Sequence, residues 1–379
     1  MARLFGRSLQ LMPSEFHWLA MKGEVVYQFA FDVANEILTK SIPQLLNVPS
    51  APLEIRADHT IPKDVPLYKP FTIELPPSES RLRDRPVETL ARVFEVGVVT
   101  VVARVPFEVR RLEELRSFHA PLLDSGETID ELAKRVCRDI CRRISAAIVR
   151  GEAPSEPEAY TVFCLTELDG ETNTAAWFAR ERRAVAGLLA ESDAATLSEL
   201  QVEESLRVCR SFSHADLTVI DWDAALAVEL DGYADDVLYA LELANLQLEE
   251  FHVMDRRLDQ YLEEVYKDLE SYKLPLVGTP KRTLERLRRF RVDATKLTDE
   301  VTHITKFFGD WHLARVYLGA AERFHLQEWR QSVEQRLSQL DQVYTVIQSE
   351  VYERRMLWLE VAVVICFIVD LLAIFFWKG

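Results

Sequence analysis

Near its C-terminal end the chain reads MLWLEVAVVICFIVDLLAIFFW, residues 356–377, and this segment decides the architecture that the sequence predicts. Its only charged residues are Glu360 and Asp370. A helix of about 20 apolar residues spans the hydrocarbon layer of a bilayer, which is roughly 30 Å thick. Tryptophans stand close to both ends of the segment, where amphipathic rings favour the headgroup region. The sequence therefore predicts one transmembrane helix over 356–377.

The basic residues that flank this segment predict its orientation. Arg354 and Arg355 precede it, and Lys378 follows it. Because Lys and Arg are enriched on the cytoplasmic side of membrane helices, we expect the large N-terminal part to face the cytoplasm, or the mitochondrial matrix in a eukaryotic cell. The expected protein is a single-pass membrane protein with a C-terminal anchor.

Glu360 and Asp370 are the candidate functional residues of the predicted membrane segment. An ionisable group near the middle of a membrane costs about 2.5–3.5 kcal/mol on insertion scales, so it usually faces a partner or water. Glu360 lies near the interface and can reach the headgroups, whereas Asp370 has apolar residues on both sides. Two interpretations of Asp370 stay open. A protonated Asp370 hydrogen-bonds to the same helix of a second subunit, or a ring of carboxylates lines an ion path.

Upstream of the membrane segment, three stretches carry apolar residues at heptad spacing, which is typical of helices that pack along one another. They cover 237–269, 287–308 and 333–351. Prolines separate the first two stretches, which predicts an antiparallel helical hairpin. The third runs directly into the membrane segment. We expect a helical hairpin and stalk over 234–355 that supports self-association into a homo-oligomer.

The sequence before residue 234 mixes strands and helices. Apolar residues alternate at 27–31 and 71–75, as in half-buried strands. The segment 91–105 predicts a hairpin or a kinked strand about Gly97. Thr128 and Glu131 have the spacing of a capping box, so a helix should begin there.

Residues 151–159, GEAPSEPEA, have the composition of a linker and divide this region in two. We expect a mixed α/β N-terminal domain over 1–150 and a second α/β part over 160–233. Within the second part, we expect strands and helices as follows: strands at 161–168 and 216–222, and helical segments around 177–191 and 197–209. The predicted fold is an α+β soluble head, followed by a long antiparallel helical or coiled-coil stalk and one C-terminal transmembrane helix.

Charge limits the partners that the protein can have. The chain carries 45 basic and 61 acidic residues, a formal net charge of −16. The acidic residues concentrate in the middle of the chain, which argues against a nucleic-acid groove there, and we expect no direct DNA binding. A short basic cluster lies at 281–291. It could contact lipid headgroups or RNA, or it could pair with the acidic middle or form a solvated helix face.

Six carboxylates fall within 221–236, where they could bind a hard cation such as Mg²⁺. They are Asp221, Asp223, Glu229, Asp231, Asp235 and Asp236. Their spacing does not match a calcium-binding loop, and Asp231 or Asp235 is also an ordinary residue for a helix N-terminus. The alternatives stay open, and we assign no metal or cofactor from the sequence.

Other residues with chemical potential are scattered. Cys137 and Cys141 lie one helical turn apart, but no nearby Cys or His completes a set of four metal ligands. His303 and His312 are interpreted as polar-face or interhelix residues. The motifs GxxxxGK[ST], GxGxxG, GxSxG and HExxH are all absent. We therefore expect that the protein is not an enzyme.

Four segments carry a resemblance to a known family. They are LTVIDWDAALAVEL (217–230), LELANLQLEEF (241–251), FFGDWHLARVY (307–317) and RMLWLEVAVVICFIVD (355–370). These segments resemble the "required for meiotic nuclear division" family of membrane proteins and its uncharacterised bacterial relatives. The resemblance implies an α/β soluble domain, a helical stalk, a C-terminal membrane anchor and self-association. For mitochondrial members it also implies a link to the organisation of translation at the inner membrane, without established catalysis.

Together these features predict a tail-anchored, self-associating membrane protein whose head is a binding or scaffolding module for an unidentified protein partner. The alternative is an oligomeric cation channel or a transport accessory protein that uses the intramembrane carboxylates. Magnesium channels of similar outline carry a Gly-Met-Asn loop between two membrane helices, and this chain has one such helix and no such loop.

Overall fold

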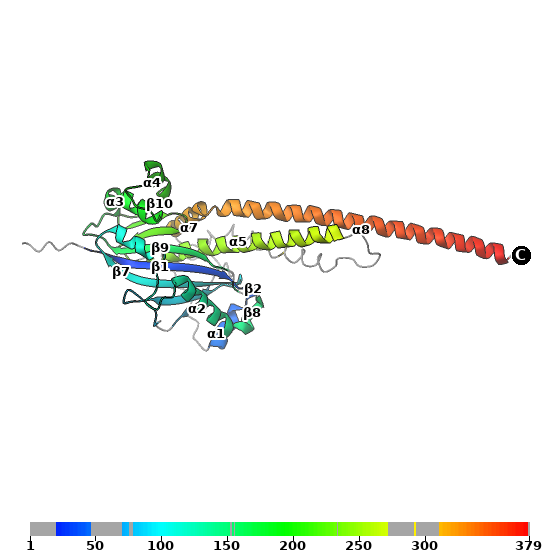
Figure 1. Ribbon diagram of the computed structural model, residues 1–379, viewed down its shortest axis with the longest axis horizontal. Coiled ribbons are helices and arrows are strands. Elements are labelled where there is room, and N and C mark those ends of the chain that lie inside the picture. Colours follow the sequence, from blue (N-terminus) through cyan, green and yellow to red (C-terminus); the bar gives the residue numbers. More distant parts are fainter. Residues whose placement is uncertain are drawn as a thin grey trace, which may run out of the picture.

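A computed structural model shows a mixed β-sheet with helices at one end of the molecule and two long helices that extend away from it (Figure 1). The α+β class predicted for the head is confirmed. The structure describes the following residues: 20–46, 70–75, 79–151, 154, 156–232, 234–271, 292 and 311–377.

One eight-stranded sheet forms the framework of the head, in the order β10-β11-β12-β9-β1-β7-β6-β3. Its strands are β1 (Met21–Asp32), β3 (Phe71–Glu74), β6 (Glu88–Val93), β7 (Val98–Val109), β9 (Glu158–Glu167), β10 (Val208–Arg210), β11 (Asp216–Ile220) and β12 (Ala224–Glu229). Neighbouring strands are antiparallel except β12 and β9, which are parallel. Strand β1 pairs with both β7 and β9, so segments on the two sides of the predicted linker share one sheet.

Two small sheets flank this framework. They pair β2 (Ala34–Ile37) with β8 (Ile148–Gly151), and β4 (Arg81–Leu82) with β5 (Arg85–Pro86). The helices are α1 (Ile42–Leu46), α2 (Ile129–Arg143), α3 (Thr174–Leu189), α4 (Glu199–Ser205), α5 (Ala234–Ser271), α7 (Trp311–Arg323) and α8 (Leu326–Trp377), and short 3-10 helices lie at Thr39–Ser41, Leu112–Phe118 and Ser145–Ala147.

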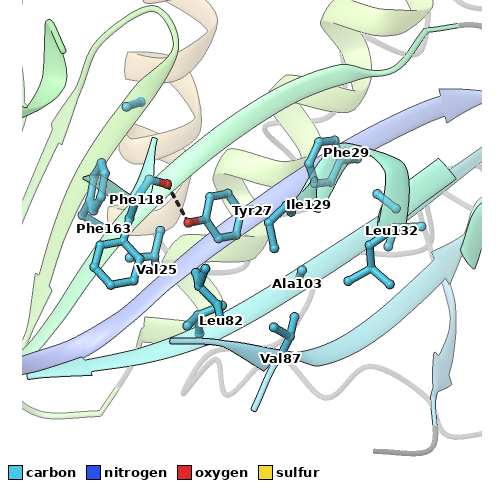
Figure 2. Close-up of a cluster of buried hydrophobic side chains, with 14 of the residues drawn as sticks. Val25, Tyr27, Phe29, Leu82, Val87, Ala103, Phe118, Ile129, Leu132 and Phe163 are labelled. Carbon is cyan, nitrogen blue, oxygen red and sulfur yellow. Dashed lines mark hydrogen bonds between the residues drawn. The ribbon is translucent and has the colours of Figure 1, made fainter. Parts of the chain in front are cut away.

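The prediction that 27–31 forms a half-buried strand is wrong in one respect, because both faces of β1 are buried. On one face Tyr27 and Phe29 pack into a core that includes residues of α2 (Figure 2). There the Tyr27 hydroxyl donates a hydrogen bond to the Phe118 carbonyl at 2.6 Å. The opposite face packs against α5, and Gln28 Nε2 donates to the Leu238 carbonyl at 2.8 Å. Helices cover both faces of the sheet, so the polar Gln28 becomes a buried residue.

Several local predictions are confirmed. Strands β6 and β7 form the hairpin predicted about Gly97, which has a φ of +96°. Helix α2 begins with the predicted capping box, in which the Glu131 amide donates to Thr128 Oγ1 at 3.1 Å and the Thr128 amide donates to Glu131 Oε2 at 2.8 Å. The carboxylate and hydroxyl thus satisfy amides that the first helical turn leaves without a partner.

The helix predicted around 197–209 is partly wrong. Helix α4 ends at Ser205, and Val208–Arg210 forms the edge strand β10, in which Cys209 pairs with Val219 of β11. Sheet pairing overrides local helix propensity here. Strand β12 was not predicted, because its alanine-rich sequence carries little β propensity.

Helices α5 and α8 run side by side away from the sheet (Figure 1). Helix α5 has 38 residues, which corresponds to a length of about 57 Å. Leu258 of α5 is buried in the same core as Val333 and Leu340 of α8, and Arg336 Nη1 lies 3.1 Å from Asp255 Oδ1. The helix predicted at 287–308 lies outside the described residues except for Val292, and so does the turn before it.

Helix α8 continues through the segment predicted to cross a membrane. Within it, Met356–Ala373 is the one candidate span in the described part of the chain, by length and composition, and none of its side chains is buried. An apolar helix that packs against nothing in the described part of its own chain is compatible with a single transmembrane helix.

Candidate functional site

The two carboxylates predicted within the membrane segment, Glu360 and Asp370, both lie in the exposed apolar part of α8. They are nearly three helical turns apart along one helix, since a turn takes 3.6 residues. The fold of one chain does not bring them together into a site.

The six carboxylates of 221–236 do not converge on one site either. Asp221 is buried and accepts a hydrogen bond from Arg323 Nε of α7 at 3.0 Å. Asp235 Oδ1 lies 2.6 Å from Arg104 Nη2 on β7. These two acids are therefore neutralised by arginines. Glu229 alone of the six belongs to a group whose geometry suits a metal ion.

That group joins Glu229 with Asp216 and His312. Asp216 on β11 stands directly opposite Glu229 on β12 in the antiparallel register. His312 comes from the first turn of α7, which packs against β10 and β11. One potential ligand atom from each of the three side chains lies within 4.8 Å of the other two.

The electrostatics of this group are unusual for a protein interior. Glu229 is only 3% exposed, and burial raises the pKa of its carboxyl group to about 8, with further contributions from Asp216, Asp231 and Asp236. Asp216 is held by backbone amides, with Phe212 N donating to Oδ2 at 2.8 Å and Ser213 N donating to Oδ1. His312 Nε2 lies 3.6 Å from Asp216 Oδ2. This arrangement attracts positive charge.

A second group of possible metal ligands comprises Glu158, Glu249 and His252. Both of its carboxylates already have partners, because His252 Nδ1 lies 2.9 Å from Glu158 Oε2 and Arg256 Nη2 lies 3.4 Å from Glu249 Oε1. We interpret this group as a network of ion pairs that joins α5 to β9.

Buried polar residues on α5 were not singled out in the sequence. Glu242 accepts hydrogen bonds from Arg92 and Thr100, and Asn245 Nδ2 donates to the Glu158 carbonyl at 3.1 Å. These contacts fix the helix in one position on the sheet. The signal that could have revealed them is the position of these polar residues directly beside the heptad seam, since Glu242 and Asn245 follow Leu241 and Ala244.

Cys137 and Cys141 lie with their sulfur atoms 4.0 Å apart. In the described ranges, no third cysteine, histidine or carboxylate joins them into a metal-binding group. The basic cluster at 281–291 lies outside the described residues.

Residues 22–235 match the sequence profile of a protein family, the N-terminal domain of the uncharacterized protein MJ0711. The chain belongs to this family. A relative from Methanocaldococcus jannaschii, described as "Uncharacterized protein MJ0711", is 21% identical over 292 residues, which cover 77% of this chain and 83% of the relative.

The region that matches the family contains the eight-stranded sheet except for Met21 and ends at the start of α5. Asp216 and Glu229 therefore belong to the family domain, whereas His312 comes from the helices beyond it. The resemblance to the "required for meiotic nuclear division" family stays a prediction.

Proposed function

We propose that this member of the family is a membrane-anchored protein whose head binds a protein partner beside the bilayer. In this proposal α8 anchors the chain through Met356–Ala373, and α5 with the first half of α8 forms a stalk that holds the head away from the membrane. The N-terminal part faces the cytoplasm or the mitochondrial matrix.

The observation that carries the proposal is the continuity of α8. It starts beside the head, where Leu326 is buried, packs on α5 through Val333 and Leu340, and continues into the exposed apolar segment. Because the helix is continuous, it holds the sheet of the head at a fixed distance from the membrane segment. An exposed apolar surface of this length in water would favour aggregation, and a bilayer covers it.

The surface of the head supports a binding role. Phe212, Trp222 and Trp311 are large aromatic side chains that are 79%, 47% and 78% exposed. Aromatic residues are enriched in the cores of protein interfaces. We infer that the partner contacts the head along α7, where Phe212 and Trp311 lie near the start of the helix and Trp222 lies near its end.

Self-association belongs to the same proposal, but the structure changes where we expect it to occur. Val333 and Leu340, two residues of the heptad stretch 333–351 from which we predicted a self-associating stalk, are buried in a core that they share with α5 of their own chain. We therefore propose that chains associate through the membrane segment, where Asp370 can hydrogen-bond to a neighbouring helix.

Truncation tests the anchor. A chain that ends at Arg355 is expected to leave the membrane fraction on extraction with alkaline carbonate, whereas the full chain resists it. The control is a full chain with both Glu360→Leu and Asp370→Leu, which should remain in the membrane because apolar length alone anchors it. The proposal fails if the truncated chain resists extraction as the full chain does.

A further inference from the structure

Asp216, Glu229 and His312 form a side-chain cluster that the proposed function leaves unused. Their potential ligand atoms lie within 4.8 Å of one another, although the residues come from three elements, β11, β12 and α7. The charges around these three residues indicate which kind of ligand they can bind.

The register of the sheet forces the two carboxylates together. Asp216 and Glu229 are directly opposite each other, on the face of β11 and β12 that turns toward α7. The same face carries the buried Thr218, and its residues Ile220, Ala225 and Ala227 lie in the core. Like charges at opposite positions of an antiparallel pair destabilise a sheet. A positive charge beside Asp216 and Glu229 would offset the repulsion between their carboxylates.

The described part of the protein supplies no such charge to Glu229. The carboxylate is almost completely buried, and no hydrogen bond or ion pair reaches it from any residue that the structure describes. The charged groups that act electrostatically on Glu229 are Asp216, Asp231 and Asp236, which are all acidic. A buried carboxylate without a partner is rare in proteins, and it marks the place of a positively charged ligand.

The geometry of the neighbouring groups suits a metal ion. The amides of Phe212 and Ser213 fix the Asp216 carboxylate, and each of its oxygens keeps a lone pair for a metal. His312 adds an imidazole at 3.6 Å from that carboxylate. Imidazole with two carboxylates suits Zn²⁺ and Mn²⁺ better than Mg²⁺ or Ca²⁺, which favour oxygen ligands alone.

We propose that Asp216, Glu229 and His312 bind one divalent transition-metal ion of the class of Zn²⁺ and Mn²⁺. Three protein ligands leave at least one coordination position for water. The ion neutralises the carboxylate pair and joins the edge of the sheet to the start of α7.

A second contact, at the other end of α7, also attaches this helix to the region of β11. At the other end of α7, Arg323 binds Asp221, which follows β11 directly. The eleven-residue step from 312 to 323 rises about 16 Å along a helix, and the five-residue step from 216 to 221 rises about 17 Å along a strand. Helix α7 therefore lies along β11 with both ends held, by the metal at one end and by the arginine at the other, and α7 leads into α8.

The test measures metal binding by the full chain in detergent micelles after removal of metal with EDTA. Zn²⁺ is titrated in competition with a chromophoric chelator, and Mn²⁺ is followed by the electron paramagnetic resonance of the free ion. We expect one equivalent to bind to the wild type. Glu229→Gln and His312→Ala should each lower the affinity by about 100-fold or more, because even residues that only support metal ligands contribute 10- to 100-fold.

Two control variants make the result specific. His214→Ala removes an exposed histidine beside β11, and His252→Ala removes the histidine of the second group, so both should bind metal as the wild type does. Zn²⁺ should also raise the Tm of the wild type and leave that of Glu229→Gln unchanged, since a ligand that binds only the folded state stabilises it.

Three results would overturn the proposal. They are a wild type that binds no stoichiometric Zn²⁺ or Mn²⁺ at micromolar concentrations, a Glu229→Gln or His312→Ala chain that binds as the wild type does, and loss of binding in His252→Ala instead. Glu229→Gln keeps the shape of the side chain, and His312→Ala changes a different element, so a folding defect in one leaves the other to decide.

Discussion

Glu242 shows how single residues set the position of α5 on the sheet. Its carboxylate is 1% exposed and binds Arg92, whose guanidinium also lies 5.4 Å from the ring of Tyr239. Two buried opposite charges neutralise each other, but the removal of one leaves the other buried without a partner. The pair therefore fixes the position of α5 on the sheet, and its effect on stability becomes measurable when one of the two residues is replaced.

The first prediction follows from this pair. Glu242→Ala should lower the free energy of unfolding by about 3–5 kcal/mol, because the charge of Arg92 stays buried. The double variant Arg92→Met with Glu242→Leu should lose less than Glu242→Ala. Urea denaturation followed by circular dichroism measures both, and Glu263→Ala, which breaks an exposed pair with Lys267 on the same helix, is the control. An equal loss in the single and double variants would contradict the explanation.

Asp370 is the residue on which the alternatives of scaffold and channel differ. Asp370→Asn keeps a hydrogen-bond donor and an acceptor and removes the option of charge, so oligomer size should stay nearly unchanged. Asp370→Leu should loosen the assembly, since hydrogen bonds between membrane helices contribute roughly 1–2 kcal/mol or less. Light scattering in detergent measures oligomer size.

Cation flux in liposomes separates the two interpretations of Asp370. The field of a conducting carboxylate ring depends on its charge. Wild-type flux that disappears in Asp370→Asn would therefore favour the channel, whereas the absence of flux in all three forms agrees with the proposed scaffold.

At the scale of elements, the hairpin of β6 and β7 depends on its turn. The carbonyl of Gly97 accepts hydrogen bonds from the amides of Val33 and Ala34 at 3.0 and 3.2 Å, so the turn also holds the end of β1. A Cβ atom at Gly97 would lie 1.9 Å from the Ala34 carbonyl oxygen. Only glycine combines this close approach with a positive φ.

Gly97→Ala should therefore destabilise the head by more than the roughly 1–3 kcal/mol that a strained backbone conformation costs. Gly126→Ala is the matched control, because Gly126 also has a positive φ, +84°, but an added Cβ would meet nothing within 4 Å. Thermal unfolding compares Gly126→Ala, which has backbone strain alone, with Gly97→Ala, which combines this strain with a clash between the new Cβ and the Ala34 carbonyl oxygen. The explanation is wrong if both variants lower Tm equally.

Leu340 tests the packing of α5 against α8. It is 5% exposed within a single chain, so Leu340→Asp should lower the free energy of unfolding by about 3 kcal/mol or more through lost burial and a buried charge. Gln339→Asp, one residue earlier on the exposed side of α8, should change little. A loss of oligomer size at full helix stability would instead favour the stalk as the site of assembly.

At the scale of the whole molecule, the head and the membrane segment contribute separately to stability. Met356–Ala373 buries none of its side chains in the protein. A chain that ends at Arg355 should therefore unfold within a few degrees of the Tm of the full chain in detergent. Differential scanning calorimetry measures this, and a large drop in Tm would mean that the span stabilises the head through contacts in an assembly.

The sequence by itself determined the features that depend on neighbouring residues. The apolar run of 356–377, the capping box at Thr128 and Glu131, the turn at Gly97 and the length of α5 are local, because each arises from spacing along one segment. The family resemblance and the function that it implies stay predictions.

Only the tertiary structure decided which distant segments meet. Burial on both faces of β1 depends on α5, which lies far along the chain, and β10 forms because β11 offers an edge to residues that read as a helix. Asp216, Glu229 and His312 converge because sheet register and helix packing bring them together. The spacing of apolar residues shows which of them share one face of a helix or strand. Which other element packs on that face depends on contacts between distant segments, and no local pattern encodes these contacts.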